Sequence, residues 1–77
     1  MGAMKSCRVL VVEDERSIAE NLLYALGPEG FDAVHRLTGG EGLEEFAEGG
    51  IDFVVLDLGL PDISGFDVCR KIRETSE

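Results

Sequence analysis

Two short apolar runs, each followed directly by acidic residues, constrain what this chain can fold into. Residues 8–12 end at Glu13 and Asp14. Residues 53–56 end at Asp57. Continuous apolar runs of this length are typical of strands that are buried on both faces of a parallel sheet. Sites in open α/β sheets lie beyond the carboxyl ends of the strands, so three carboxylates are expected to converge if these two strands are neighbours.

Other strand and helix signals alternate with these runs. Residues 31–37 predict a second strand, with Val34 as its clearest core residue, and residues 51–56 predict the third strand. A helical segment follows each strand. The order is therefore β-α-β-α-β-α, which favours a parallel sheet and an α/β fold.

The helices are predicted from the spacing of apolar residues and from stop signals. The first begins near Asp14 or Glu15, ends at Gly27-Pro28, and has its main apolar positions at Ile18, Leu22, Ala25 and Leu26. Thr38 is the predicted N-cap of the second helix, with Glu41 reaching back in a capping box. Gly49-Gly50 ends that helix. The third covers about residues 66–73, with apolar positions at Phe66, Val68, Cys69 and Ile72.

Composition limits the function classes. The chain has 77 residues and a formal net charge of −9, which indicates one compact unit and argues against nucleic acid as a direct partner of this segment. No apolar run approaches the roughly 18 residues of a membrane span. Cys7 and Cys69 are far apart and are expected to be reduced thiols of a cytoplasmic protein. Residues 1–4 are expected to be a vector-derived or disordered N-terminus.

The acidic residues predict a metal site. Carboxylates that lie within a few ångströms of one another raise each other's pKa values, and a divalent cation relieves this repulsion. Mg²⁺ suits one or two carboxylates together with water and phosphate oxygens. A carboxylate in such a site can act as a nucleophile and form an acyl phosphate. Taken singly, Asp14 could be a helix N-cap, Asp57 a turn residue and Glu13 a solvated charge.

Two segments together resemble the response-regulator receiver family of two-component signalling. They are residues 9–15, Val-Leu-Val-Val-Glu-Asp-Glu, and residues 54–65, Val-Val-Leu-Asp-Leu-Gly-Leu-Pro-Asp-Ile-Ser-Gly. The loop is most similar to that of winged-helix transcriptional regulators. The resemblance implies a flavodoxin-like (CheY-like) α/β fold whose parallel sheet has the strand order 2-1-3.

The resemblance also implies roles for individual residues. Asp57 would take a phosphoryl group from the phosphohistidine of a histidine kinase. Asp14 would bind Mg²⁺ directly, Glu13 through water, and Gly59 through its backbone carbonyl. Such a domain is a phospho-acceptor in signalling rather than an enzyme, with at most weak Mg²⁺-dependent self-phosphorylation and self-dephosphorylation.

Residues 5–77 resemble only the first three strand–helix units of a receiver, so a partial, truncated domain is expected. The hydroxyl and lysine residues that a receiver supplies after its fourth and fifth strands are absent, so phosphorylation and switching are expected to be impaired. Lys71 cannot be assumed to replace that lysine. The third strand would be an exposed apolar edge, which favours a homo-oligomer, with a dimer expected.

Two other functions stay open. The chain could be an interaction and oligomerisation module of receiver-like fold that is not phosphorylated. It could also be a hydrolase of the haloacid-dehalogenase type, but these enzymes need a second acid two residues after the nucleophile, where this chain has Gly59. His35 is expected to lie away from the acidic crevice, in a packing or surface role.

Overall fold

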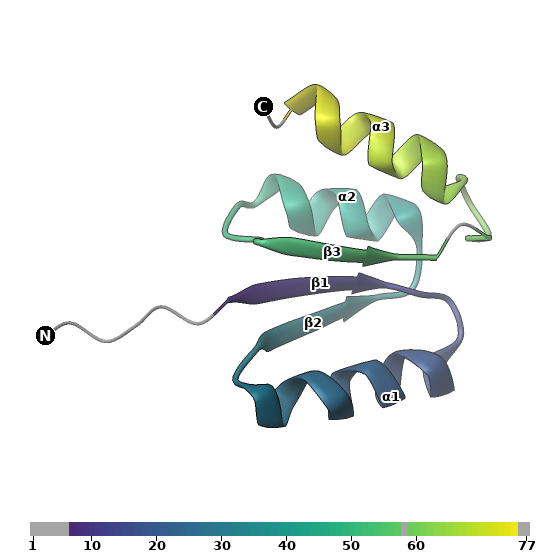
Figure 1. Cartoon of the computed structure of the whole chain (residues 1–77). Helices are drawn as coiled ribbons and strands as arrows, with labels where there is room; N and C mark the ends of the chain where they lie inside the picture. Colours follow the sequence, from purple (N-terminus) through teal and green to yellow (C-terminus); the bar gives the residue numbers. More distant parts are fainter. Residues whose placement is uncertain (1–6, 58, 76–77) are drawn as a thin grey trace, which may run out of the picture.

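The computed structural model describes residues 7–57 and 59–75. Segment 1–4, the first residues of the predicted domain 5–77, and Leu58 of the loop lie outside the described residues. Figure 1 shows strands and helices alternating along the chain, as predicted. In chain order the elements are β1 (Arg8–Val12), α1 (Arg16–Leu26), the 3₁₀ turn η1 (Gly27–Glu29), β2 (Asp32–Arg36), α2 (Gly39–Ala47), β3 (Phe53–Leu56) and α3 (Gly65–Thr75).

The three strands form one parallel sheet in the order β2-β1-β3, so the predicted α/β class and the 2-1-3 order are confirmed. Central β1 pairs on one side with β2, where Leu10 faces Val34. On the other side it pairs with β3, where Val12 faces Leu56. Residues 9–12 of β1 are all buried, as expected for a strand that is covered on both faces.

Helices cover both faces of the sheet and give three layers (Figure 1). On one face α1 packs over β1 and β2, and Ala19 is buried there against Val9 and Val11. On the other face lie α2 and α3, and Val68 of α3 packs with Leu10 and Val12. Alternate residues of β1 therefore belong to two separate apolar clusters.

Most element boundaries agree with the predicted ones. Strand β2 is one residue shorter at each end than residues 31–37, and β3 begins two residues later than residue 51. Differences of this size are usual where hydrogen-bond criteria define the ends. Gly49 and Gly50 follow α2 with φ angles of 92° and 86°, a left-handed conformation that glycine adopts without strain.

Several apolar positions expected in the helix stripes are exposed instead. Ile18 is 44% exposed and Phe66 is 67% exposed, and Cys69 also faces solvent. The buried side of α1 is centred on Ala19, with Leu22 beside it, so Ile18 lies at its margin. On α3 the side chain of Val68 is buried against the sheet, and Ile72 packs beside it.

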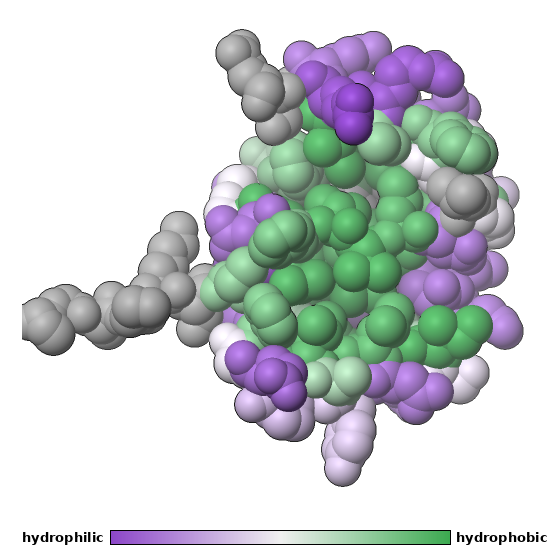
Figure 2. All heavy atoms as spheres, in the orientation of Figure 1, coloured by the Kyte–Doolittle hydropathy of each residue, from purple (hydrophilic) through white to green (hydrophobic). Residues whose placement is uncertain are grey.

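Strand β3 is an edge of the sheet within the described residues. On the same face of the sheet as α1, it has apolar side chains that α1 does not cover. Phe53 is 62% exposed and Val55 is 40% exposed. Their register partners Val9 and Val11 are on the α1 face. Figure 2 shows apolar side chains gathered across the middle of this view. The expected exposed edge is confirmed.

No helix among the described residues is long and apolar enough to cross a membrane. Cys7 is half-buried and Cys69 is exposed, and both are free thiols.

Gly42→Ala should destabilise the fold. A Cβ at residue 42 would lie 2.7 Å from Cγ2 of the buried Val12, and overpacking of this kind costs about 1–3 kcal/mol. The control is Gly27→Ala, where a Cβ meets nothing within 4 Å and the backbone is already right-handed helical. Urea unfolding should show a lower free energy of unfolding for Gly42→Ala alone. Equal stability of the two variants would contradict this packing.

Candidate functional site

The acidic residues converge because β1 and β3 are parallel neighbours. Beyond the last register pair, the amide of Asp57 donates to the carbonyl oxygen of Val12 at 3.0 Å, which extends the pairing to the acid itself. Carboxylate oxygens of Glu13, Asp14 and Asp57 all lie within 4.8 Å of one another. The prediction that these three side chains meet at the carboxyl end of the sheet is confirmed.

Backbone amides hold two of the three carboxylates. Glu13 Oε2 accepts from the Glu15 amide at 3.1 Å, just before α1 begins. Asp57 Oδ1 accepts from the Gly59 amide, also at 3.1 Å. Each of these two carboxylates therefore accepts a hydrogen bond from the backbone amide two residues later in the chain. Asp14 is exposed, whereas the other two acids are half-buried.

The pKa of Glu13 is raised. Desolvation is the largest cause, and the charges of Asp57 and Asp14 add to it, while the bond from the Glu15 amide acts in the opposite direction. A group with a raised pKa binds its proton more tightly in the folded chain. Its stabilising contribution is therefore complete at pH values below about 4.3, the usual value, and is lost as pH rises through the raised pKa.

The side-chain cations with described ion pairs bind other acids. Arg8 and Arg36 pair with Glu45, at 3.8 and 2.6 Å, and Arg70 pairs with Asp67 at 3.0 Å. Among the described ion pairs, none joins a lysine or arginine to the three carboxylates. Three carboxylates with oxygens within 4.8 Å of one another, of which Glu13 has a raised pKa, are a donor set that suits a hard divalent cation such as Mg²⁺.

Gly59 lies where the sequence placed it, in the loop after Asp57, and it is exposed. The structure assigns its amide a role, as a donor to Asp57. The use of its carbonyl as a metal ligand stays a prediction.

Two residues that contact this region were missed. His35 was expected away from the crevice, but its Nε2 lies 2.7 Å from the carbonyl oxygen of Glu13, so the expected location is wrong, whereas this backbone contact agrees with the expected packing role. The Glu13 amide also donates to Arg36, at 3.1 Å. Asp62 was counted only as part of a loop, yet both of its oxygens bind the first turn of α2. The sequence did contain a hint of this contact. Asp62 directly follows a proline in the loop, and two adjacent glycines, Gly39 and Gly40, begin α2 and leave their amides accessible to a carboxylate.

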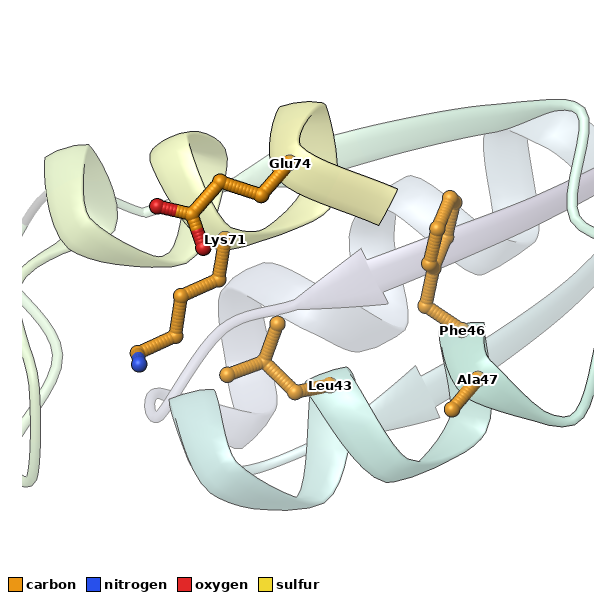
Figure 3. A pocket seen from close by; sticks show the side chains of 5 residues that line it. All are labelled: Leu43, Phe46, Ala47, Lys71 and Glu74. Atoms are coloured by element: carbon orange, nitrogen blue, oxygen red, sulfur yellow. The ribbon is translucent and has the colours of Figure 1, made fainter. Parts of the chain in front are cut away.

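A cavity of about 580 Å³ lies elsewhere, between α2 and α3 (Figure 3). Its lining is apolar on α2 and charged on α3, and consists of Leu43, Phe46, Ala47, Lys71 and Glu74. The Lys71 side chain thus lines this groove.

Comparisons with known proteins agree with this geometry. Residues 9–77 match the family model for the response regulator receiver domain. The sensory transduction protein RegX3 of Mycobacterium tuberculosis is 48% identical over 68 residues, which are 88% of this chain and 30% of RegX3. This chain therefore spans about a third or less of the length of such relatives.

Solved structures show the same fold. A CheY-like receiver domain protein from Methanospirillum hungatei superimposes with a TM-score of 0.90 at 26% identity, over 94% of this chain and 58% of that one. The response regulator TrrA of Thermotoga maritima, solved with Mg²⁺ and BeF, has a TM-score of 0.88 at 40% identity, over 91% of this chain and 61% of that one. TrrA has also been solved in complex with the histidine kinase ThkA, with a TM-score of 0.87 over 91% of this chain and 60% of that one.

Asp57→Asn should make the metal-free chain more stable and remove its response to Mg²⁺. The substitution removes a charge that raises the pKa of Glu13, so that pKa should fall, as measured by NMR titration of the carboxyl carbon. Mg²⁺ at about 100 times its dissociation constant should add about 2.7 kcal/mol to the stability of the unsubstituted chain in thermal unfolding.

Asp67→Asn is the control, because Asp67 is an acid on α3 that pairs with Arg70. This variant should keep the full response to Mg²⁺. Equal stabilisation of the Asp57→Asn variant by Mg²⁺ would show that the ion binds somewhere other than the three-carboxylate site.

Proposed function

The chain belongs to the response regulator receiver domain family, and we propose that it accepts a phosphoryl group on Asp57 from the phosphohistidine of a histidine kinase. One observation carries the proposal: the Asp57 carboxylate lies at the end of β3, with Glu13 and Asp14 oxygens within 4.8 Å. The complex of TrrA with ThkA supports a kinase as the partner. The domain acts as a phospho-acceptor rather than as an enzyme on an external substrate.

In the proposed reaction a carboxylate oxygen of Asp57 attacks the phosphorus atom. The bond between phosphorus and the kinase imidazole nitrogen breaks, its electron pair stays with that nitrogen, and a phosphorus–oxygen bond forms on Asp57. The Gly59 amide donates to Oδ1 of Asp57 at 3.1 Å, which supports Oδ2 as the attacking oxygen in this proposal.

Glu13, Asp14 and Asp57 are the residues that we propose to hold Mg²⁺, and the structure of TrrA with Mg²⁺ and BeF supports this choice of ion. Bound there, the ion supplies positive charge that neutralises the phosphoryl oxygens near these carboxylates. Glu13 and Asp14 would thus contribute ligand oxygens to Mg²⁺, and because the ion offsets their negative charge, they would repel an incoming phosphoryl group less. Direct binding by Asp14 and water-mediated binding by Glu13 stay part of the proposal.

Phosphorylation of this 77-residue chain is expected to be slow. Stabilisation of developing phosphoryl charge by a protein cation is a large part of such catalysis. The described ion pairs bring no lysine or arginine to the site, and Lys71 lines the groove between α2 and α3.

The activities of a longer protein are a wider proposal. Because this chain spans about 30% of RegX3, a winged-helix output domain and control of transcription rest on the loop resemblance alone. The net charge of −9 fits a role for this segment that does not include binding nucleic acid directly. A cytoplasmic location is part of the same proposal.

A second candidate function is supported by the apolar surface on β3. Phe53 and Val55 expose large apolar side chains beside an unpaired strand edge, and such edges pair with other chains. We propose that a second copy covers this edge and forms a homodimer. An interaction module of this kind needs no phosphate chemistry.

A small phosphodonor with Mg²⁺ should add one phosphoryl group to the chain, detected by intact-mass measurement. The increase should be slow, should require Mg²⁺, and should be absent in Asp57→Asn. Rapid and complete modification would show that a protein cation is not needed. Equal modification of the Asp57→Asn variant would refute Asp57 as the acceptor.

Val55→Lys should convert a dimer to a monomer, because a charge on the exposed face of β3 opposes pairing with a second chain. The control is Tyr24→Lys, since Tyr24 is 83% exposed but lies on α1, away from the strand edge. Light scattering should give the dimer mass for the unsubstituted chain and for Tyr24→Lys. A monomer at high concentration in all three samples would refute the dimer.

A further inference from the structure

The first turn of α2 takes its hydrogen-bond acceptors from two parts of the chain. Thr38 Oγ1 accepts from the amide of Glu41 at 3.1 Å, as the capping box predicts. Asp62 lies 23 residues beyond Gly39, and its Oδ1 accepts from the Gly39 amide at 2.9 Å. Its Oδ2 accepts from the Gly40 amide at 2.8 Å. The first amides of a helix have no partner inside it, so Asp62 satisfies the two that Thr38 leaves.

Charge reinforces these two bonds. The N-terminus of a helix carries partial positive charge, which favours a carboxylate there. The amides of Gly40 and Gly39 hold the pKa of Asp62 below its usual range, because both bonds stabilise the ionised carboxylate. The contact is thus a charged clamp between a loop and a helix end.

Close packing accompanies the hydrogen bonds. A Cβ on Gly39 would lie 2.6 Å from Cγ1 of Ile63 and 2.9 Å from Cγ2 of Val68. A Cβ on Gly40 would lie 3.3 Å from Oδ2 of Asp62. The loop therefore approaches α2 more closely than any residue with a side chain at position 39 would allow.

The clamped loop is the one that carries the acceptor aspartate. It starts at Asp57, whose carboxylate is held by the Gly59 amide. Leu60 is buried in the apolar cluster with Leu10 and Val12, and Asp62 follows two residues later. Gly59 and Pro61 on either side of Leu60 are exposed. Leu60 and Asp62 thus anchor the loop after Asp57.

The other acidic segment is fixed to the same place. The Glu13 carbonyl accepts from His35, and the Glu13 amide donates to Arg36, at the end of β2. Only residues 37 and 38 separate Arg36 from Gly39. The junction formed by residues 35–40 therefore holds both the segment with Glu13 and the loop with Asp57.

We propose that Asp62 is a positioning residue of the acidic site. By clamping residues 59–62 to the first turn of α2, it fixes Asp57 and Gly59 relative to Glu13, and so sets how tightly the site binds Mg²⁺. The metal-binding part rests on the proposed function, whereas the effect on the conformation of the loop does not.

The test compares Asp62→Ala with Thr38→Ala. Both remove acceptors from the same helix end, but only Asp62 belongs to the loop. NMR of the metal-free chain should show a changed shift and faster exchange of the Gly59 amide in Asp62→Ala, and unchanged values in Thr38→Ala. Titration with Mg²⁺ alone should give a dissociation constant raised about tenfold in Asp62→Ala and unchanged in Thr38→Ala.

Asp62→Asn keeps one acceptor oxygen and should give intermediate values for both measurements. This variant also replaces Asp62→Ala in the test if the alanine variant does not fold. The proposal is wrong if Gly59 and the affinity for Mg²⁺ are unchanged while the Gly39 and Gly40 amides lose protection. It is also wrong if Thr38→Ala weakens Mg²⁺ binding as much as Asp62→Ala does. If the unsubstituted chain binds no Mg²⁺, the proposed function fails, and the Gly59 comparison alone decides whether Asp62 positions the loop.

Discussion

Repulsion between like charges is the constraint on which the rest of this structure depends. Glu13, Asp14 and Asp57 hold oxygens within 4.8 Å of one another, an arrangement that separate loops would avoid. The parallel pairing of β1 with β3 enforces it, because the two strands end side by side and the pairing continues to the Asp57 amide. The apolar clusters on both faces of β1 supply the burial that keeps these strands in register.

Local contacts reduce the repulsion without removing it. Backbone amides of Glu15 and Gly59 bind two of the carboxylates, while Arg8 and Arg36 are directed to Glu45 on α2. These two arginines therefore hold β1 and β2 to α2, and among the described ion pairs none brings a cation to the three carboxylates. The arrangement favours a cation from solution, which can come and go, over a fixed protein charge.

The parts of the fold that depend on local pattern were predictable from the sequence. Apolar runs gave the strands, and the strand-end acids gave the convergence of Glu13, Asp14 and Asp57. The side chains of Asp62 and His35 were not predictable in the same way, because their partners are 22 or 23 residues away and are backbone atoms without a sequence signature. Exposure of Ile18 was missed because apolar spacing does not fix how far a helix face is rotated toward the sheet.

Gly39 has a consequence for attempts to exchange parts between members of this family. The space that a Cβ would need there is taken by Ile63 from the loop and by Val68 from α3. A loop transplanted from a relative brings its own residue at position 63 but leaves position 39 and α3 behind. Chimeras that move residues 57–65 alone will therefore be compatible only by chance. Those that move the start of α2, the loop and the first turns of α3 as one block keep the three contacting surfaces matched.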